Sequence, residues 1–313
     1  MRFGVHLTHY RPVDAPEPAV ELAQQAEELG FSSVWAGDHI VDPVRVEARY
    51  PHSPPGAIRK AQNNGGMADP FILLAVIAGR TTTVKLGFDI IVVPYRAPVP
   101  VAKQIATLDS LSGGRVIVGI GVGWHIQEFE ALGQPFAQRG GRTDEAVEIW
   151  RKLWTGENVG FNGPYTSFEP VRMLPRPVQP GGPPIYIGGD GPKTRARVSR
   201  YGDGWIPTFF SAERFKREMD EIRAASLANG RPAPVAAIQR PIVITDTRYE
   251  PTKADLENPY RQLIGNPDQI IEAIRGYRDA GVEELVFRTG QDPAEVGRVM
   301  TRFVRDVLPA IRA

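Results

Sequence analysis

Short apolar runs alternate with amphipathic segments along the whole chain. Apolar runs typical of strands span residues 2–8, 33–37, 84–93, 115–120, 184–187, 204–208, 241–245 and 284–287. Helical spacing or helix-start signals cover residues 17–29, 70–80, 98–110, 143–153, 192–201 and 212–229, with two late helices after Asn266-Pro267 and Asp292-Pro293. Strands separated by helices of about 10–15 residues are typical of βαβ units and a parallel sheet. The pattern predicts an α/β fold, a (β/α)8 TIM barrel forming a single domain over residues 1–313.

Three regions interrupt this alternation, at residues 40–68, 157–183 and 248–265. The second contains Asn162-Gly163 between two extended segments, which predicts a β-hairpin. Loops of this length inside a compact domain are usually lids or binding loops. We therefore expect insertions at the C-terminal face of the barrel, where substrates enter.

Composition narrows the class of protein. Lys and Arg total 37 against 36 Asp and Glu, and no basic cluster is present, so nucleic-acid binding is not expected. The longest apolar runs are well short of the ~20 residues that span a bilayer. With no cysteine and no signal-peptide pattern, the expected location is the cytoplasm. The expected partners are a small-molecule substrate and, as a possible assembly, a second copy of the chain.

The strand ends carry the candidate chemistry, because βα barrels place reactive groups there. The first strand ends at Thr8-His9-Tyr10 and the second at Asp38-His39. His39 beside a carboxylate is a candidate general acid or base near neutral pH. Asp89 interrupts an apolar run, so it marks either a bulge or a site residue.

Glycines gather at two further strand ends. A strand runs into Gly188, Gly189, Asp190 and Gly191, after which Pro192 starts a helix. This layout offers backbone N–H groups and a helix N-terminus to a phosphate, although a tight strand–helix turn would need the same glycines.

The other glycine-rich strand end spans residues 119–124, GIGVGW. Gly119, Gly121 and Gly123 have the wrong spacing for a dinucleotide fingerprint. They indicate either close approach of a flat ligand or packing of the barrel, and both readings stay open.

A metal site is not expected. His6, His9 and His39 are the obvious imidazoles near strand ends. Positions i and i+3 of a strand point to opposite faces, and no ligand pair with metal spacing accompanies them.

Ordered motifs resemble the bacterial luciferase-like oxidoreductase family, and in detail its branch that uses the deazaflavin coenzyme F420. They are residues 35–39 (WAGDH), 85–94 (KLGFDIIVVP), 102–115 (AKQIATLDSLSGGR), 119–124 with 128–129, 139–144 (RGGRTD), 184–192 (PIYIGGDGP) and 202–205 (GDGW). Residues 266–269 (NPDQ) through 280–282 (AGV) resemble the family's last βα unit.

The resemblance implies a cofactor ring at the C-terminal mouth of the barrel. Asp38 and His39 would flank the ring, with His39 near the hydride-carrying carbon. Asp89 and Ile90 would form a bulge with a non-prolyl cis peptide behind the ring, although the family often has a small residue where Asp89 stands.

The rest of the cofactor would lie along glycines. Gly188, Gly189, Asp190 and Gly191 would take the cofactor phosphate, and Gly121 and Gly123 would lie along the tail. Some deazaflavin dehydrogenases carry a glutamate acid where this chain has Trp124, which argues against a sugar-phosphate dehydrogenase.

The sequence therefore predicts an F420-dependent oxidoreductase that transfers a hydride between the deazaflavin and a small organic substrate. The alternative is an FMN-dependent luciferase-like monooxygenase, because the cofactor decides whether oxygen is activated. Remoter alternatives are a non-catalytic flavin- or deazaflavin-binding protein and a metal-dependent barrel hydrolase.

Overall fold

Eight parallel strands close into a barrel in the computed structural model, which describes residues 1–7, 17–41, 43, 67–258, 263–290 and 292–312. The ring runs β1–β2–β3–β5–β8–β9–β10–β12, and β12 pairs with β1 to close it. The strands are β1 (Arg2–His6), β2 (Ser33–Ala36), β3 (Lys85–Phe88), β5 (Val116–Gly121), β8 (Ile185–Gly188), β9 (Gly204–Ile206), β10 (Val235–Ile244) and β12 (Glu284–Arg288). The predicted (β/α)8 barrel is confirmed.

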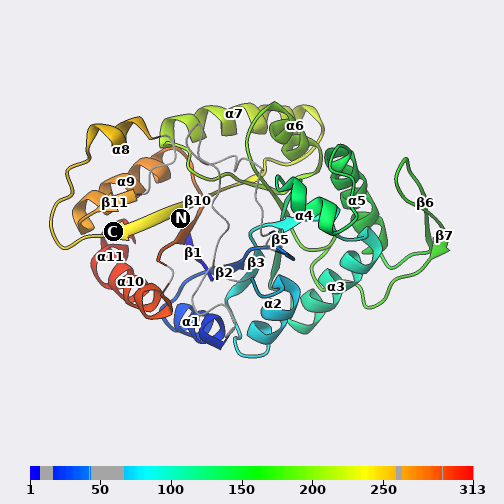
Figure 1. The fold of residues 1–313 in the computed structure, drawn as a ribbon, viewed down its shortest axis with the longest axis horizontal. Helices are drawn as coiled ribbons and strands as arrows, with labels where there is room; N and C mark the ends of the chain where they lie inside the picture. The colour runs from blue at the N-terminus through cyan, green and yellow to red at the C-terminus, as the bar shows by residue number, and fades with distance from the viewer. Residues whose placement is uncertain (8–16, 42, 44–66, 259–262, 291, 313) are drawn as a thin grey trace.

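Helices surround the strands (Figure 1). The longer ones are α1 (Glu17–Glu28), α2 (Pro70–Ala78), α3 (Pro98–Leu111), α5 (Arg139–Leu153), α6 (Pro192–Tyr201), α7 (Ala212–Ala228), α9 (Pro267–Asp279) and α10 (Pro293–Asp306). Asp69, Asn266 and Asp292 cap α2, α9 and α10 through side-chain oxygens that accept from first-turn amides, with a proline at the start of each helix. Short α4 (Ile126–Ala131), α8 (Lys253–Glu257), α11 (Leu308–Arg312) and the 3-10 turn η1 (Val93–Tyr95) complete the described helices.

Side chains fill the barrel interior. Trp35, Ile117, Tyr186, Ile206, Ala237 and Val286 form a buried cluster inside the ring. Gly87 leaves room for the Trp35 indole, since a Cβ at Gly87 would overlap it. The inward faces of the strands therefore make a packed floor below the C-terminal mouth.

The structure differs from the predicted elements in two strands. The expected strand at 84–93 divides into β3 and β4 (Ile91–Val92), separated by Asp89 and Ile90. Strand β10 begins at Val235, six residues before the strand expected at 241–245. Pro241, which lacks an N–H, marked the strand start in the sequence, but it lies where the ring segment of β10 ends against Arg288.

Two insertions are partly described. Strands β6 (Val159–Asn162) and β7 (Ser167–Val171) form the predicted antiparallel hairpin, which projects from one side of the barrel (Figure 1). Strand β11 (Leu263–Gly265) pairs with the end of β10. None of the described helices is long and apolar enough to cross a membrane.

Candidate functional site

The predicted site residues follow different strands but reach the same edge of the barrel. Asp38 and His39 follow β2, Asp89 and Ile90 follow β3, and Gly121 ends β5. Gly188 ends β8, and Gly191 precedes α6. Because all ring strands are parallel, these positions share the C-terminal mouth. Thr8, His9 and Tyr10 lie outside the described residues, as does most of the loop 40–68.

His39 is held by Glu128 on α4, 89 residues away in the chain. His39 Nδ1 lies 2.7 Å from Glu128 Oε2, and the carboxylate is fully buried while the imidazole is 21% exposed. An ionised carboxylate only accepts hydrogen bonds, so Nδ1 carries the proton in this pair. Nε2 has no hydrogen-bond partner among the described residues, so it is the nitrogen available to a ligand.

Glu128 organises this side of the mouth. Its Oε1 accepts from the amides of Ile40 at 2.7 Å and Val41 at 3.3 Å, and its Oε2 also accepts from Tyr95 Oη at 2.7 Å. Burial alone would raise the pKa of Glu128, but the hydrogen bonds from His39, Tyr95 and Ile40 outweigh it and hold the pKa below its usual value. A buried anion therefore fixes both the His39 ring and the backbone that follows it.

The carboxylate beside His39 in sequence has a different role. Asp38 Oδ2 and Oδ1 accept from Arg96 Nη1 at 2.7 Å and Nη2 at 2.9 Å, and Oδ2 also accepts from the Val92 amide at 3.0 Å. Burial raises the pKa of Asp38, and the two Arg96 contacts oppose that rise. Asp38 thus joins the end of β2 to β4 and η1, while Glu128 is the carboxylate that contacts His39.

His39, His125 and Glu128 place potential metal-ligand atoms within 4.8 Å of one another. The His39–Glu128 distance of 2.7 Å is that of a proton-bridged contact, and His125 Nδ1 lies 3.7 Å from the same oxygen. The His125 ring stacks on Trp124 at 4.7 Å. Hydrogen bonding and stacking account for this geometry without a metal.

The Asp89–Ile90 peptide bond is cis, as the resemblance implied. The Asp89 carbonyl lies 3.1 Å from His6 Nε2, and Asp89 Oδ2 lies 3.9 Å from the same nitrogen. Burial is the main cause that raises the pKa of Asp89 to about 7 and lowers the pKa of His6 to about 3. His6 is therefore neutral at neutral pH, and Asp89 titrates there.

The glycines at the end of β5 are explained by packing. A Cβ at Gly119 would overlap the Phe88 carbonyl, and one at Gly121 would overlap Ile90 Cδ1. Gly123 has φ +80°, and a Cβ there would lie 2.6 Å from Val92 Cγ1. Of the two readings left open by the sequence, barrel packing is the one whose contacts the structure shows.

The turn before α6 has the features of a phosphate site. Gly189 and Gly191 have φ of 98° and 92°, and no side chain caps α6 at Gly191. Asp190 hydrogen-bonds the Gly191 amide, and its charge is paired with Arg214 at 2.7 Å. First-turn amides of α6 thus remain available to an anion, which the positive end of the helix favours.

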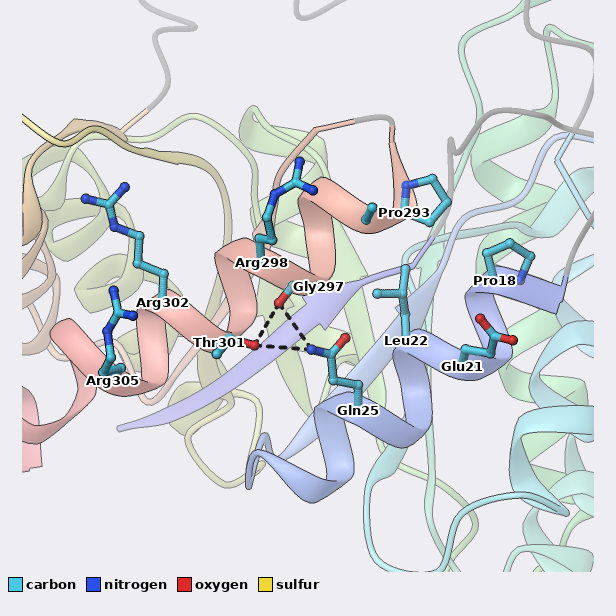
Figure 2. A pocket seen from close by; sticks show the side chains of 11 residues that line it. Pro18, Glu21, Leu22, Gln25, Pro293, Gly297, Arg298, Thr301, Arg302 and Arg305 are labelled. Atoms are coloured by element: carbon cyan, nitrogen blue, oxygen red, sulfur yellow. Dashed lines mark hydrogen bonds between the residues drawn. The ribbon is translucent and has the colours of Figure 1, made fainter.

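A groove between α1 and α10 lies outside the barrel. Figure 2 shows Arg298, Arg302 and Arg305 along α10 and Gln25 on α1, whose amide donates to Gly297 O and Thr301 Oγ1 at 3.2 Å. None of the predicted site residues lines this groove.

The sequence did not identify Glu128, Tyr95 and Arg96 as site residues. Glu128 and Tyr95 contact His39 or its partner, and Arg96 holds Asp38. The available signal was weak, since α4 is too short for helical periodicity and each contact joins distant segments. Only the resemblance motif at residues 128–129 pointed to Glu128.

The model of the luciferase-like monooxygenase family matches residues 1–262. An F420-dependent glucose-6-phosphate dehydrogenase of Amycolatopsis mediterranei is 31% identical, with 95% of each chain covered. The uncharacterized protein Mb0965c of Mycobacterium bovis is 36% identical over 187 residues, and the match covers 60% of this chain and 64% of that relative. The chain therefore spans less than two thirds of that relative's length.

A solved structure shares the fold over nearly the whole length. The monooxygenase RslO1 from Streptomyces bottropensis superposes with a TM-score of 0.81 at 25% identity, covering 99% of each chain. The chain therefore belongs to the luciferase-like monooxygenase family, in the branch that includes F420-dependent enzymes.

Proposed function

We propose that the protein is an F420-dependent oxidoreductase that transfers a hydride between the deazaflavin and a small organic substrate. The single observation that carries the proposal is the His39–Glu128 pair, which presents at the barrel mouth an Nε2 that makes no hydrogen bond with the described residues. The F420 dependence named for the Amycolatopsis mediterranei relative, similar along 95% of both chains, supports the choice of cofactor.

The protein's part in the reaction is to move one proton. Bound F420 supplies the carbon that gives or accepts the hydride. When the substrate is an alcohol, His39 Nε2 accepts the hydroxyl proton, and in the reverse direction it returns that proton to the carbonyl oxygen. Glu128 stays ionised next to Nδ1 and compensates the imidazolium that forms.

The turn before α6 would hold the cofactor phosphate. Gly188, Gly189 and Gly191 bring backbone without side chains to the helix N-terminus, with Asp190 neutralised by Arg214. Gly121 and Gly123 are proposed to border the cofactor tail. Asp38 would contribute indirectly, by fixing β4 and so the Asp89–Ile90 turn behind the ring.

A second candidate is an FMN-dependent monooxygenase. The likeness to the monooxygenase RslO1 favours it. A site built for phosphate and a planar ring suits either cofactor, so the two functions differ in which cofactor binds. A non-catalytic cofactor carrier would share the phosphate turn but would not need an imidazole held by a buried carboxylate.

We also propose a homodimer through α2. The helix sequence, PFILLAVIA, is apolar on every side, and Ile72 and Val76 are 67% and 48% exposed one turn apart. A helix that is apolar all round is normally buried on all sides. A second copy related by a twofold axis would cover this face with its own Ile72 and Val76.

The activity is tested by supplying reduced F420 with a panel of carbonyl compounds, or oxidised F420 with alcohols, and following the deazaflavin absorbance. We expect turnover by the wild type, and a loss of ~10²–10⁴-fold in His39→Ala with F420 affinity nearly unchanged. Turnover that is unaffected in His39→Ala would remove His39 from the mechanism.

A further inference from the structure

Three polar side chains at the ends of β12, β1 and β3 face the floor of the barrel mouth. The ring order places β12 beside β1, and β1 is followed by β2 and β3. His6 ends β1, Arg288 ends β12, and Asp89 follows β3. Val286 belongs to the barrel interior, so Arg288, two residues later on the same strand, points to the same side.

Two of these groups lack the partners that their chemistry demands. The Asp89 side chain is 7% exposed, and its Oδ2 has no hydrogen-bond partner among the described residues. The half-buried Arg288 makes no hydrogen bond or ion pair with any described residue. Burial is the main cause of the pKa shifts of His6 and Asp89, and the Arg288 charge acts on both: it lowers the pKa of His6 further and opposes the rise in the pKa of Asp89.

Arg288 and Asp89 therefore share the barrel interior without forming an ion pair. A guanidinium and a carboxyl in one buried site normally form an ion pair, as Arg96 and Asp38 do elsewhere at the barrel mouth. No contact within 4.0 Å joins Arg288 to Asp89 in the described structure, so neither group is neutralised by the other.

We propose that Arg288 and Asp89 bind the carboxylate of a small organic acid, which is the substrate of the hydride transfer. This inference rests on the proposed function, because it names the substrate class of the same mouth. Arg288 supplies the charge and a forked donor to the carboxylate oxygens. Protonated Asp89 donates a further hydrogen bond, and neutral His6 adds no charge beside it.

The position is consistent with reaction at His39. Arg288 and His39 follow strands two places apart in the ring, a separation of about 10 Å between strand axes. A carboxylate anchored at Arg288 would thus leave a carbon a few bonds away near His39 Nε2. Trp35 and Val286 close the floor, which favours a small acid.

The test uses cofactor-free protein, so that it does not depend on which cofactor binds. Acetate, lactate and benzoate are titrated at constant ionic strength, each against its uncharged amide, and the unfolding temperature and tryptophan fluorescence are followed. We expect saturable binding of at least one acid and none of its amide. Arg288→Gln should weaken the binding of that acid about 10- to 100-fold, and Arg288→Lys should weaken it less.

The matched control is Arg298→Gln, which changes an exposed arginine on α10 and should bind the acids as the wild type does. Near pH 7 the wild-type affinity should fall about tenfold from pH 6 to pH 8, since Asp89 loses its proton and then repels the acid. In Asp89→Asn this fall should disappear, because His6, whose pKa is lowered to about 3 mainly by burial, stays neutral throughout that range.

Other results would overturn the proposal. It fails if none of the acids binds, if amides bind as tightly as acids, or if Arg288→Gln binds the acids normally. It also fails if Arg288→Gln keeps its affinity for the acids but loses affinity for F420 or FMN. That result would mean that the guanidinium binds the cofactor. Failure of F420 binding alone would contradict the proposed function and leave the carboxylate site standing.

Discussion

At the scale of single residues, Glu128 determines which nitrogen of His39 faces the mouth. Its Oε1 accepts two backbone amides, from Ile40 and Val41, so only Oε2 is left for His39 and Tyr95. A glutamine would fit the same space, but only one of its two terminal atoms could accept hydrogen bonds.

Glu128→Gln should slow turnover by roughly 10²–10⁴-fold with little change in F420 affinity. The backbone amides of Ile40 and Val41 need an acceptor at the Oε1 position, so the glutamine oxygen takes that place. The glutamine NH2 must then face His39 and donate to Nδ1. The ring proton then moves to Nε2, which can no longer accept one. Glu130→Gln, an exposed change on the same helix, is the control, and equal losses in both variants would contradict this explanation.

Among single residues, the sequence predicts the candidates themselves but not the groups around them. His39 and Asp89 could be predicted as candidates because each follows an apolar run, which is a local signal. Their surroundings could not, because Glu128 contacts His39 from a distant segment and Arg288 shares the barrel interior with Asp89 only once the barrel closes. Gly121 and Gly123 remained ambiguous for the same reason, since Ile90, just before β4, and Val92, in β4, pack on them from a different part of the chain.

At the scale of elements, Arg96 connects three segments that the cofactor site needs. Its guanidinium contacts Asp38 after β2 and Asp69, the N-cap of α2, at 3.1 Å, and it follows η1 directly. The Asp38 carboxylate is fully buried, so its charge has no access to solvent.

Arg96→Met should destabilise the protein by about 3–5 kcal/mol in urea unfolding at pH 8, because it leaves a buried carboxylate without its counter-ion. The loss should be smaller at pH 5, since burial raises the pKa of Asp38 and an unpaired carboxyl can then take up a proton. Asp69→Asn keeps the cap and should cost under about 1 kcal/mol. Similar losses at both pH values would contradict the role given to the charge.

Element boundaries were predictable where capping chemistry marks them. Helix α6 starts and ends as the sequence indicated, and the proline-capped starts of α2, α9 and α10 were found. Strand β10 was misplaced because Pro241 has the appearance of a strand start, and α4 was missed because six residues are too few to show a helical period.

At the scale of the whole molecule, the strand–helix alternation was enough to predict the closed barrel, since parallel strands with helical crossovers have few other solutions. The exposed apolar face of α2 leads us to expect that two copies of the chain associate. Ile72→Glu should convert a dimer to monomer in sedimentation experiments, because it places a charge at the apolar contact.

Leu227→Glu, on the exposed side of α7, is the control for that change and should leave assembly as in the wild type. A wild-type protein that sediments as a monomer at every concentration, or an Ile72→Glu variant that still dimerises, would contradict the α2 interface.

The most direct test of the central claim is a titration of the purified protein with F420 and with FMN, followed by quenching of cofactor fluorescence. The account predicts saturable F420 binding that persists in His39→Ala and Glu128→Gln, with much weaker binding of FMN. Tight binding of FMN with no binding of F420 would contradict it and favour the monooxygenase.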